Sequence, residues 1–577
     1  MPCWPRPLPT ETRDDRQPFL AMPSTETGST MSPNLMWFRS DLRVHDNTAL
    51  AAAAAEGPVV AVFLRSTAQW RQHGHGANKL DFWHRGVLAL RDILHGLGIP
   101  LLHRDIDSFD AAPDALLALA RESGARRLHF NREHPLNERR RDARVVSAFE
   151  EAGLTAVGHH DGVAFAPGEL RTGKGNFYGI FTPFAKAWHR QITPERLALR
   201  NAPGAQTCRS IDSDPAPEPP TLDQAPAAPE DWPAGEDAAA DRLARFLRFR
   251  ARHYAEQRDF PAEPGTSALS PYLALGMISH RQCLQAVLAE NGGGLAEGDL
   301  GLTTWVSELI WREFYQHVAV GFPEVCRHRA FQSPTEALPW RDDAPGLQAW
   351  QEGRTGYPLV DAAMRQLCAT GWMHNRLRMV TAMFLAKHLL IDWRKGEAFF
   401  MEHLVDGEFA ANNGGWQWAA STGTDAVPYF RIFNPTTQSR RFDPDGRFIA
   451  NWVPELADLP AKDRHAPSPE QRVTRDYPAR SSIIAPLAPG ARGLQGADAL
   501  SPNHASQDGL IRTLPATRWH GVVTEPRLPV CQDKGECSAR CPLGVHSTNA
   551  NSRLGGAAWR SHAVKRHTVI STLGTIQ

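Results

Sequence analysis

The chain has 577 residues, too many for one ordinary domain, and a hydrophobic fraction of 42% is enough to build large cores. Its 63 basic and 63 acidic side chains cancel, which excludes a globally basic nucleic-acid-binding protein and leaves only a local basic face. No membrane span, secretory signal or disulfide framework is predicted from the apolar runs, the N-terminus or the eight scattered cysteines, so we expect a cytoplasmic protein.

Short apolar runs alternate with helical stretches over residues 34–165. This alternation predicts right-handed crossovers and a parallel sheet, and therefore an α/β, Rossmann-like domain. We expect Asp46 near the N-cap of the first helix, and no dinucleotide after the first strand, where the Gly-x-Gly-x-x-Gly fingerprint is absent. The predicted strands are Leu35–Phe38, Pro58–Leu64, Ile99–His103, Arg127–Phe130 and Leu154–Val157, and the predicted helices Asp46–Glu56, Lys79–Leu97, Pro113–Glu122 and Leu136–Glu151.

The rest of the chain divides by composition. Residues 1–33 predict a disordered extension, which makes Met31 an alternative start. Residues 166–235 predict an interdomain linker, and residues 236–478 carry apolar patterns of helical period that predict an all-α domain. Residues 479–577 predict a disordered tail or a frameshift product, and the cysteines within it match no standard zinc spacing, so we assign no metal.

Polar clusters stand out in the predicted helical domain. The turn Gly265–Tyr272 offers three hydroxyl groups that could bind a phosphate, although spacing alone favours simple helix capping by Ser or Thr. Glu308 lies between Trp305 and Trp311, which is unusual for a solvent-facing position; the alternative is a core helix with a solvated Glu.

Two further clusters lie nearer the C-terminus. Asn375 and Arg378 share one face of a predicted helix, with Arg376 pointing elsewhere. The segment Asp406–Trp418 combines two Asn, two Gly and two Trp. Paired glycines permit close approach to a flat ligand, and Asn amides both donate and accept, which suits a heterocyclic ring. A capped loop with packed Trp side chains is the alternative.

Together these segments resemble the photolyase/cryptochrome family. The resemblance spans residues 34–475, from Met36–Asn47 (MWFRSDLRVHDN) through Tyr429–Thr436 (YFRIFNPT) to Trp452–Leu456 (WVPEL). Within the family, the chain is most similar to bacterial class I enzymes that repair cyclobutane pyrimidine dimers. The resemblance implies an α/β antenna domain followed by an all-α FAD-binding domain, in a protein that we expect to be a monomer.

The resemblance implies one FAD per chain, reduced in the active state. Arg378 and Asp406 would form a charge pair over the flavin ring, and Asn412 would face flavin N5. An amide there favours repair, whereas an acid is typical of plant cryptochromes. Glu408 and Ala268 stand where the family more often has Asp and Arg. The other implied FAD contacts are Tyr254, Thr266, Ser267, Ser270, Trp305, Asn375 and Glu408.

The resemblance also implies a partner, UV-damaged DNA, from which the pyrimidine dimer is flipped out. Trp311 and Trp418 would receive the dimer, Glu308 and Asn375 would stabilise charge on its carbonyls, and Met379 would pack nearby. The resemblance also gives roles to three tryptophans and three arginines. By spacing alone, these residues would be core tryptophans and ordinary surface arginines. The implied electron relay is Trp340, Trp393 and Trp416, and the implied contacts to the DNA backbone are Arg258, Arg376 and Arg431.

An antenna chromophore, 5,10-methenyltetrahydrofolate, is implied by a third set of residues. Asn137, Glu138, Cys326 and Arg327 match the folate-binding pattern, with Arg327 where these enzymes usually have Lys.

Three other functions compete with dimer repair. The main alternative is a cryptochrome-like blue-light photoreceptor, which a long C-terminal tail would suit. A photolyase for (6-4) photoproducts needs an active-site His as proton donor, and only His374 lies in the relevant segment. A DNA-binding protein without catalysis is the weakest of the three.

Overall fold

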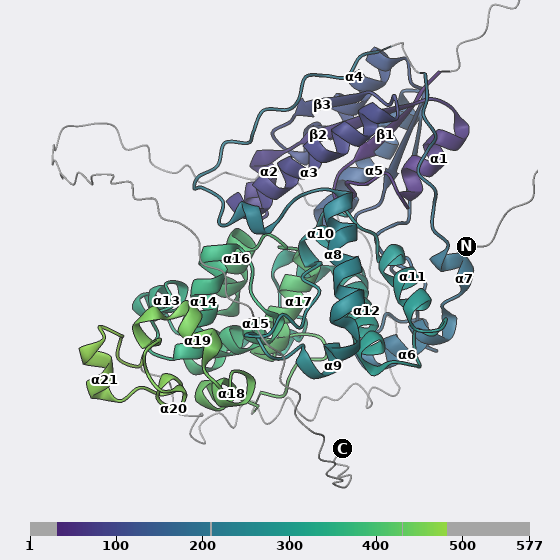
Figure 1. Cartoon of the computed structure of the whole chain (residues 1–577). Coiled ribbons are helices and arrows are strands. Elements are labelled where there is room, and N and C mark those ends of the chain that lie inside the picture. Colours follow the sequence, from purple (N-terminus) through teal and green to yellow (C-terminus); the bar gives the residue numbers. More distant parts are fainter. Residues whose placement is uncertain (1–31, 208–210, 430, 482–577) are drawn as a thin grey trace, which may run out of the picture. The chain divides into compact units, whose positions relative to one another are not determined.

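The computed structural model describes residues 32–207, 211–429 and 431–481. Its N-terminal part is a five-stranded parallel sheet in the order β3-β2-β1-β4-β5 (Figure 1), which confirms the predicted α/β class. In the register, Met36 of β1 pairs with Ala61 of β2 and with His129 of β4. The strands are β1 Asn34–Phe38, β2 Val59–Arg65, β3 Leu101–Asp105, β4 Arg127–Asn131 and β5 Thr155–His159, and the helices between them are α1 Thr48–Glu56, α2 Thr67–Gln72, α3 Ala77–Gly96, η1 Phe109–Ala111, α4 Ala112–Ser123 and α5 Leu136–Glu151.

Successive side chains of β1 enter different cores. Met36 and Phe38 belong to the core that includes α1 and α3, whereas Leu35 and Trp37 belong to the core that includes α4 and α5. Because neighbouring strand residues point to opposite faces, a sheet covered on both sides needs continuous apolar strands. The unbroken apolar runs of the sequence are explained in this way.

The described chain beyond the sheet is helical, as predicted. The predicted linker contains α6, with 11 residues, and the short helices α7 and η2, and the longest helix of the described chain after it is α12, with 22 residues. The helices are α6 Phe181–Gln191, α7 Pro194–Leu197, η2 Pro229–Asp231, α8 Glu236–Phe249, η3 Ala251–His253, α9 Tyr254–Gln257, α10 Ser270–Ala274, α11 His280–Glu290, α12 Leu300–Gly321, η4 Pro323–Arg327, η5 Ser333–Ala337, α13 Ala344–Gln351, α14 Pro358–Thr370, α15 Asn375–Met383, the π-helical turn η6 Phe384–His388, α16 Trp393–His403, α17 Phe409–Ala420, α18 Pro435–Phe442, α19 Arg447–Trp452, η7 Pro454–Leu456, α20 Ala461–Arg464 and α21 Pro469–Thr474.

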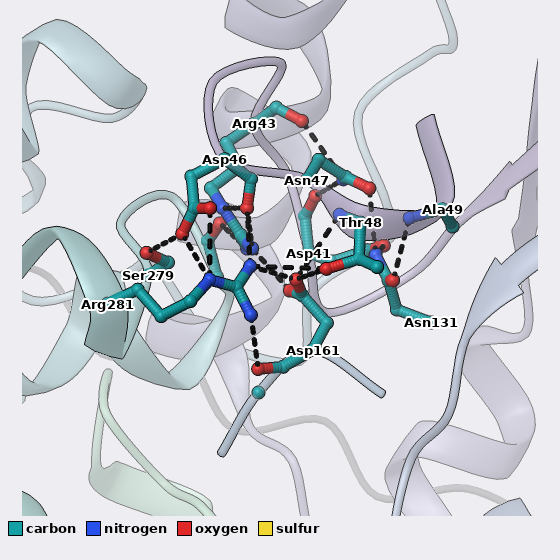
Figure 2. Close-up of polar contacts among 12 residues, drawn as sticks. Asp41, Arg43, Asp46, Asn47, Thr48, Ala49, Asn131, Asp161, Ser279 and Arg281 are labelled. Atoms are coloured by element: carbon teal, nitrogen blue, oxygen red, sulfur yellow. Dashed lines mark hydrogen bonds and ion pairs between the residues drawn. The ribbon is translucent and has the colours of Figure 1, made fainter. Parts of the chain in front are cut away.

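Asp46 lies next to the N-cap of α1, near it as predicted, but it is not the capping residue itself. Asn47, not Asp46, caps the helix, and its side chain accepts a hydrogen bond from the backbone N–H of Leu50 at 3.0 Å. Asp46 takes a left-handed φ of 52° and points its carboxylate toward Ser279 and Arg281 (Figure 2). The Asp46 carboxylate therefore binds a buried guanidinium of α11, remote in sequence, and not the first turn of α1.

Arg281 joins the sheet region to the helical region through a buried network (Figure 2). Its Nε lies 2.9 Å from Asp46 Oδ2, and its Nη2 lies 2.6 Å from Asp161 Oδ1. Arg43 also pairs with Asp161. Burial raises the pKa of Asp161, but the two guanidinium groups outweigh burial and hold it well below its usual range. Two cations facing two anions satisfy charges that would be costly to bury alone.

Several predictions lie outside the described residues. They concern Met31, all but two residues of the extension 1–33, all but three residues of the tail 479–577, and the cysteines of Cys531–Cys541. The domain boundaries at 165, 235 and 478 stay predictions. Within the described ranges, no helix is long and apolar enough to cross a membrane, and no group of three His, Cys, Asp or Glu side chains is placed to hold a metal.

Candidate active site

Four helices carry many of the residues that the sequence singled out. Glu308 lies on α12, Asn375 and Arg378 on α15, Trp393 on α16, and Asn412 on α17. Helix α17 packs directly against α12, α15 and α16. Segments separated by up to a hundred residues of sequence therefore meet around one helix.

The Glu308 side chain is partly buried, with 32% of its surface exposed, and it is paired with a cation. It forms an ion pair with Arg258, which follows α9, and the guanidinium of Arg258 lies 5.9 Å from the ring centre of buried Tyr254. Burial raises the pKa of the Glu308 carboxyl, and Arg258 partly opposes that rise. The structure therefore brings together one implied FAD contact, one implied DNA contact and the implied acidic substrate contact.

The hydroxyl groups of the turn before α10 are not helix caps. Leu269 is the N-cap of α10, and no side chain makes a capping hydrogen bond there, so the capping alternative is wrong. Ser267 Oγ instead accepts a hydrogen bond from buried Trp305 Nε1 at 3.3 Å, and Ser270 Oγ accepts one from Trp372 Nε1 at 3.4 Å. Trp372 was not predicted from the sequence as a site residue, but it contacts the same turn as Trp305.

The predicted charge pair is present. Arg378 Nη2 lies 2.8 Å from Asp406 Oδ2, and Arg378 Nε donates to the backbone oxygen of Met373. The Asp406 side chain is only 1% exposed, so this anion needs compensation, which comes from its ion pair with Arg378 and from the charge of buried Lys79. Asn375 is exposed at the start of α15, as a residue that contacts a ligand must be.

The two other residues of this region have partners of their own. Arg376 points away from Arg378 and pairs with Asp259 at 2.8 Å, so the predicted divergence of the two arginines is confirmed. His374 caps α15 by accepting from the N–H of Arg376, and burial lowers its pKa to about 4. A neutral histidine used as a cap is poorly suited to donate a proton.

Glu408 makes use of its extra methylene group. Its two carboxylate oxygens bind Arg312 on α12 at 2.9 and 3.0 Å, and Gln316 donates to it as well. Arg312 was not predicted as a site residue, although its position one helical turn after Glu308 on the same helix was a usable signal.

The amide of Asn412 has a fixed orientation. Its Nδ2 donates to the backbone oxygen of Glu397 at 3.0 Å, and this leaves the amide oxygen as its free end. The adjacent glycines differ from each other. Gly414 has no room for a Cβ because Tyr315 packs against it, whereas Gly415 faces open space. Only Gly415 can serve the close approach of a ligand that the sequence suggested.

The aromatic residues predicted to receive the dimer are partly buried. Trp311 stacks on Phe181 of α6, with ring centres 3.6 Å apart, so one face of Trp311 is already covered. Trp418 packs against the core of the helical region, and Met379 is partly buried on α15. Arg431 is exposed, and its backbone oxygen accepts from Lys387.

The three relay tryptophans differ in burial. Trp393 and Trp416 are fully buried, and Trp340 is partly exposed. Trp340 is therefore the most exposed of the three, and the relay itself stays a prediction. Within the described residues, Trp416 Nε1 has no hydrogen-bond partner. Trp416 also lies against Trp350, with ring centres 5.9 Å apart.

A cavity of about 690 Å³ opens at the carboxyl ends of β1 and β4 and reaches α12 and α17. Asn137, Glu138 and Cys326 line it, whereas Arg327 does not and pairs with Glu324. Burial, followed by repulsion from Glu133, raises the pKa of Glu138 to about 7. A carboxyl group poised near neutrality can either donate or accept a hydrogen bond inside this cavity.

Both parts of the chain match known families. Residues 34–203 match the family described as DNA photolyase, and residues 305–485 match the FAD binding domain of DNA photolyase. The deoxyribodipyrimidine photo-lyase of Escherichia coli is 46% identical over 456 residues, which cover 78% of this chain and 95% of that protein. The protein of the same name from Neurospora crassa is 39% identical and is covered over 73% of its length.

Solved structures agree in fold. A bacterial class III photolyase from Agrobacterium tumefaciens superimposes with a TM-score of 0.69 at 34% identity, covering 82% of this chain and 98% of that one. A cryptochrome from Synechocystis superimposes with a TM-score of 0.67 at 28% identity, covering 81% and 99%.

Proposed function

This chain belongs to the DNA photolyase family, and from that premise we propose that it is a light-dependent lyase that splits cyclobutane pyrimidine dimers in DNA. The observation that carries the activity is the 46% identity to a deoxyribodipyrimidine photo-lyase, which spans nearly all of that enzyme. That the chain acts as a monomer in the cytoplasm belongs to the proposal as well.

The residues present fit FAD. Three hydroxyl-bearing residues, Thr266, Ser267 and Ser270, are not used as helix caps and suit the diphosphate, and the buried Arg378–Asp406 pair offers paired charge to a ring with donors and acceptors. When bound, reduced and excited by light, FAD would supply the electron that opens the cyclobutane ring, and the electron would return to the flavin afterwards. We propose that the amide oxygen of Asn412 accepts a hydrogen bond at flavin N5.

The proposed substrate contacts are built around the ion pair of Glu308 and Arg258. Glu308, with a raised pKa, would present its carboxyl group to the dimer carbonyls together with Asn375 and would stabilise charge that develops there. Arg258 is paired with Glu308 in the described structure, so DNA binding would draw Arg258 to a phosphate and free the carboxyl. Binding of the DNA backbone by Arg258 would thereby make the Glu308 carboxyl available to the dimer.

A blue-light receptor without repair activity is the second candidate, because a cryptochrome shares the fold. Asn412 in place of an acid, together with Glu308, Trp311 and Trp418, supports repair. The variant Glu308→Gln separates the two functions: if the proposal holds, FAD binding and photoreduction stay normal and the yield of repair falls about tenfold or more. Glu336→Gln, which alters a carboxylate that pairs with Arg394, is the control.

We propose a folate antenna, 5,10-methenyltetrahydrofolate, in the cavity that Asn137, Glu138 and Cys326 line. His73 supports this location, because its ring nitrogen lies 3.1 Å from the Asn137 amide and burial keeps it neutral by lowering its pKa to about 4. Titration of the protein with the folate should give a bound near-UV chromophore, and Glu138→Ala should abolish it. Binding that Glu138→Ala leaves unchanged would move the antenna elsewhere.

A further inference from the structure

Glu397 on α16 is a buried acid in direct contact with the proposed flavin-facing amide, and neither the family resemblance nor the relay uses it. Its side chain is 3% exposed. One residue holds two neighbouring amides of α17: the backbone oxygen accepts from Asn412 at 3.0 Å, and carboxylate Oε1 accepts from Asn413 at 2.8 Å. Glu397 therefore fixes the register of α16 against α17 at Asn412.

Asn413 extends this contact into the loop after η4. Its amide oxygen accepts from Gln417 Nε2 at 2.9 Å, and Gln417 binds the backbone of Arg329 and Phe331 at 3.2 and 2.8 Å. The same loop carries His328. The orientation of the two Asn amides and the position of this loop are thus set by one chain of hydrogen bonds.

The second carboxylate oxygen of Glu397 has a titratable partner. His328 Nδ1 lies 3.1 Å from Glu397 Oε2, and the His328 side chain is 60% exposed at the wall of the cavity. His328 has a left-handed φ of 55°, which directs its ring to the carboxylate. The hydrogen bond to Glu397 raises the pKa of His328 despite partial burial.

Other charged groups reach His328 from neighbouring elements. Arg394 on α16 donates through Nε to the His328 backbone oxygen at 2.7 Å, and its positive charge opposes protonation of the ring. His73, at the end of α2, interacts electrostatically with His328 but is neutral above its own pKa of about 4. Glu397 is therefore the group that favours the charged ring, and the ring is the cation that neutralises buried Glu397.

We infer that Glu397 and His328 are positioning residues for the Asn412 amide, and that the proton on His328 sets how strongly this side of the site favours reduced FAD. The inference rests on the proposed function, because it requires flavin beside Asn412. With His328 protonated, the Glu397–His328 pair is neutral overall. With His328 neutral, an unpaired buried carboxylate remains and disfavours the added negative charge of a reduced flavin.

The test is the midpoint potential of bound FAD as a function of pH, measured on the full-length holoprotein. The wild type should show an extra downward step as His328 loses its proton, about tenfold in the ratio of reduced to oxidised flavin, or about 30 mV for a two-electron couple. His328→Asn, which tolerates the left-handed backbone, should follow the high-pH value of the wild type throughout. Glu397→Gln should follow the low-pH value.

The control variant is Glu455→Gln, whose partly buried carboxylate binds Arg365 and makes no described contact with His328, Arg394 or either Asn amide. It should keep the wild-type step. Superimposed profiles for the wild type, His328→Asn and Glu397→Gln would overturn the inference, as would an equal change in Glu455→Gln. If Glu397→Gln fails to fold, the half-exposed His328→Asn still decides. A wild type that binds no FAD or repairs no dimer would instead contradict the proposed function.

Discussion

Removal of the Arg281 guanidinium tests whether the buried network of Figure 2 holds the sheet region to the helical region. In Arg281→Met, Asp161 keeps Arg43, but Asp46 loses its charged partner and keeps only the Ser279 hydroxyl and the backbone N–H of Arg200. Both Asp side chains are at most 2% exposed. Stranding a buried charge in this way costs about 3–5 kcal/mol. We expect the free energy of unfolding at neutral pH to fall by that amount.

Urea denaturation of the wild type and Arg281→Met, followed by circular dichroism, measures the difference. Arg252→Met is the matched control, because Arg252 is half-exposed and lies 3.4 Å from Asp299, so its loss should cost about 1 kcal/mol or less. Adding Asp46→Asn to Arg281→Met should recover part of the loss by removing the stranded charge. Equal destabilisation by Arg281→Met and Arg252→Met would refute the reasoning.

The pH dependence of the same comparison has a definite sign. The pKa of Asp161 is lower in the folded state than in the unfolded state, so its contribution to stability is present above the unfolded pKa of about 3.9 and is lost as the pH falls through the folded pKa. Arg281→Met removes part of this contribution. The difference between wild type and variant should therefore shrink below about pH 4.

Three further changes have distinct expected results. A Cβ at Gly396 would lie 2.1 Å from Trp416, so Gly396→Ala should lower the free energy of unfolding by about 1–3 kcal/mol. The displaced Trp416 ring should slow photoreduction of FAD, while chemically reduced enzyme still repairs dimers. Unchanged photoreduction kinetics would argue against Trp416 as a relay residue. Burial lowers the pKa of Lys79 from 10.5 to about 8, so the free energy of unfolding of the wild type should rise between pH 8 and pH 10.5. Denaturation curves of Lys79→Met should show a smaller rise. If the rise persists in Lys79→Met, another group is responsible for the pH dependence. Arg378→Ala strands Asp406 and should weaken FAD binding about tenfold or more by fluorescence titration, and undiminished affinity would contradict the proposed contact.

Local patterns were enough to predict the sheet and its helices. The continuous apolar run of β1 predicted a strand buried on both faces, and its two sets of side chains do enter two cores. The Asn375–Arg378 spacing on α15 was readable for the same reason, because helical period alone places the two residues on one face.

Partners remote in sequence were not predictable. The Asp46 carboxylate binds Arg281, 235 residues later in the chain, and nothing near Asp46 in the sequence indicates this partner. Buried Lys79 donates to the backbone oxygen of Gly407, 328 residues away, and nothing near Lys79 in the sequence indicates it. Glu397 likewise acts through a backbone oxygen, which carries no sequence signature. Tertiary packing decides which of several competent partners a polar side chain meets.

The central claim is tested most directly by repair of a thymine-dimer oligonucleotide by the reduced holoprotein under blue or near-UV light, with a dark control. The account predicts light-dependent recovery of thymine absorbance and none in the dark. Bound, reducible FAD without repair would contradict it and would favour a blue-light receptor with the same fold.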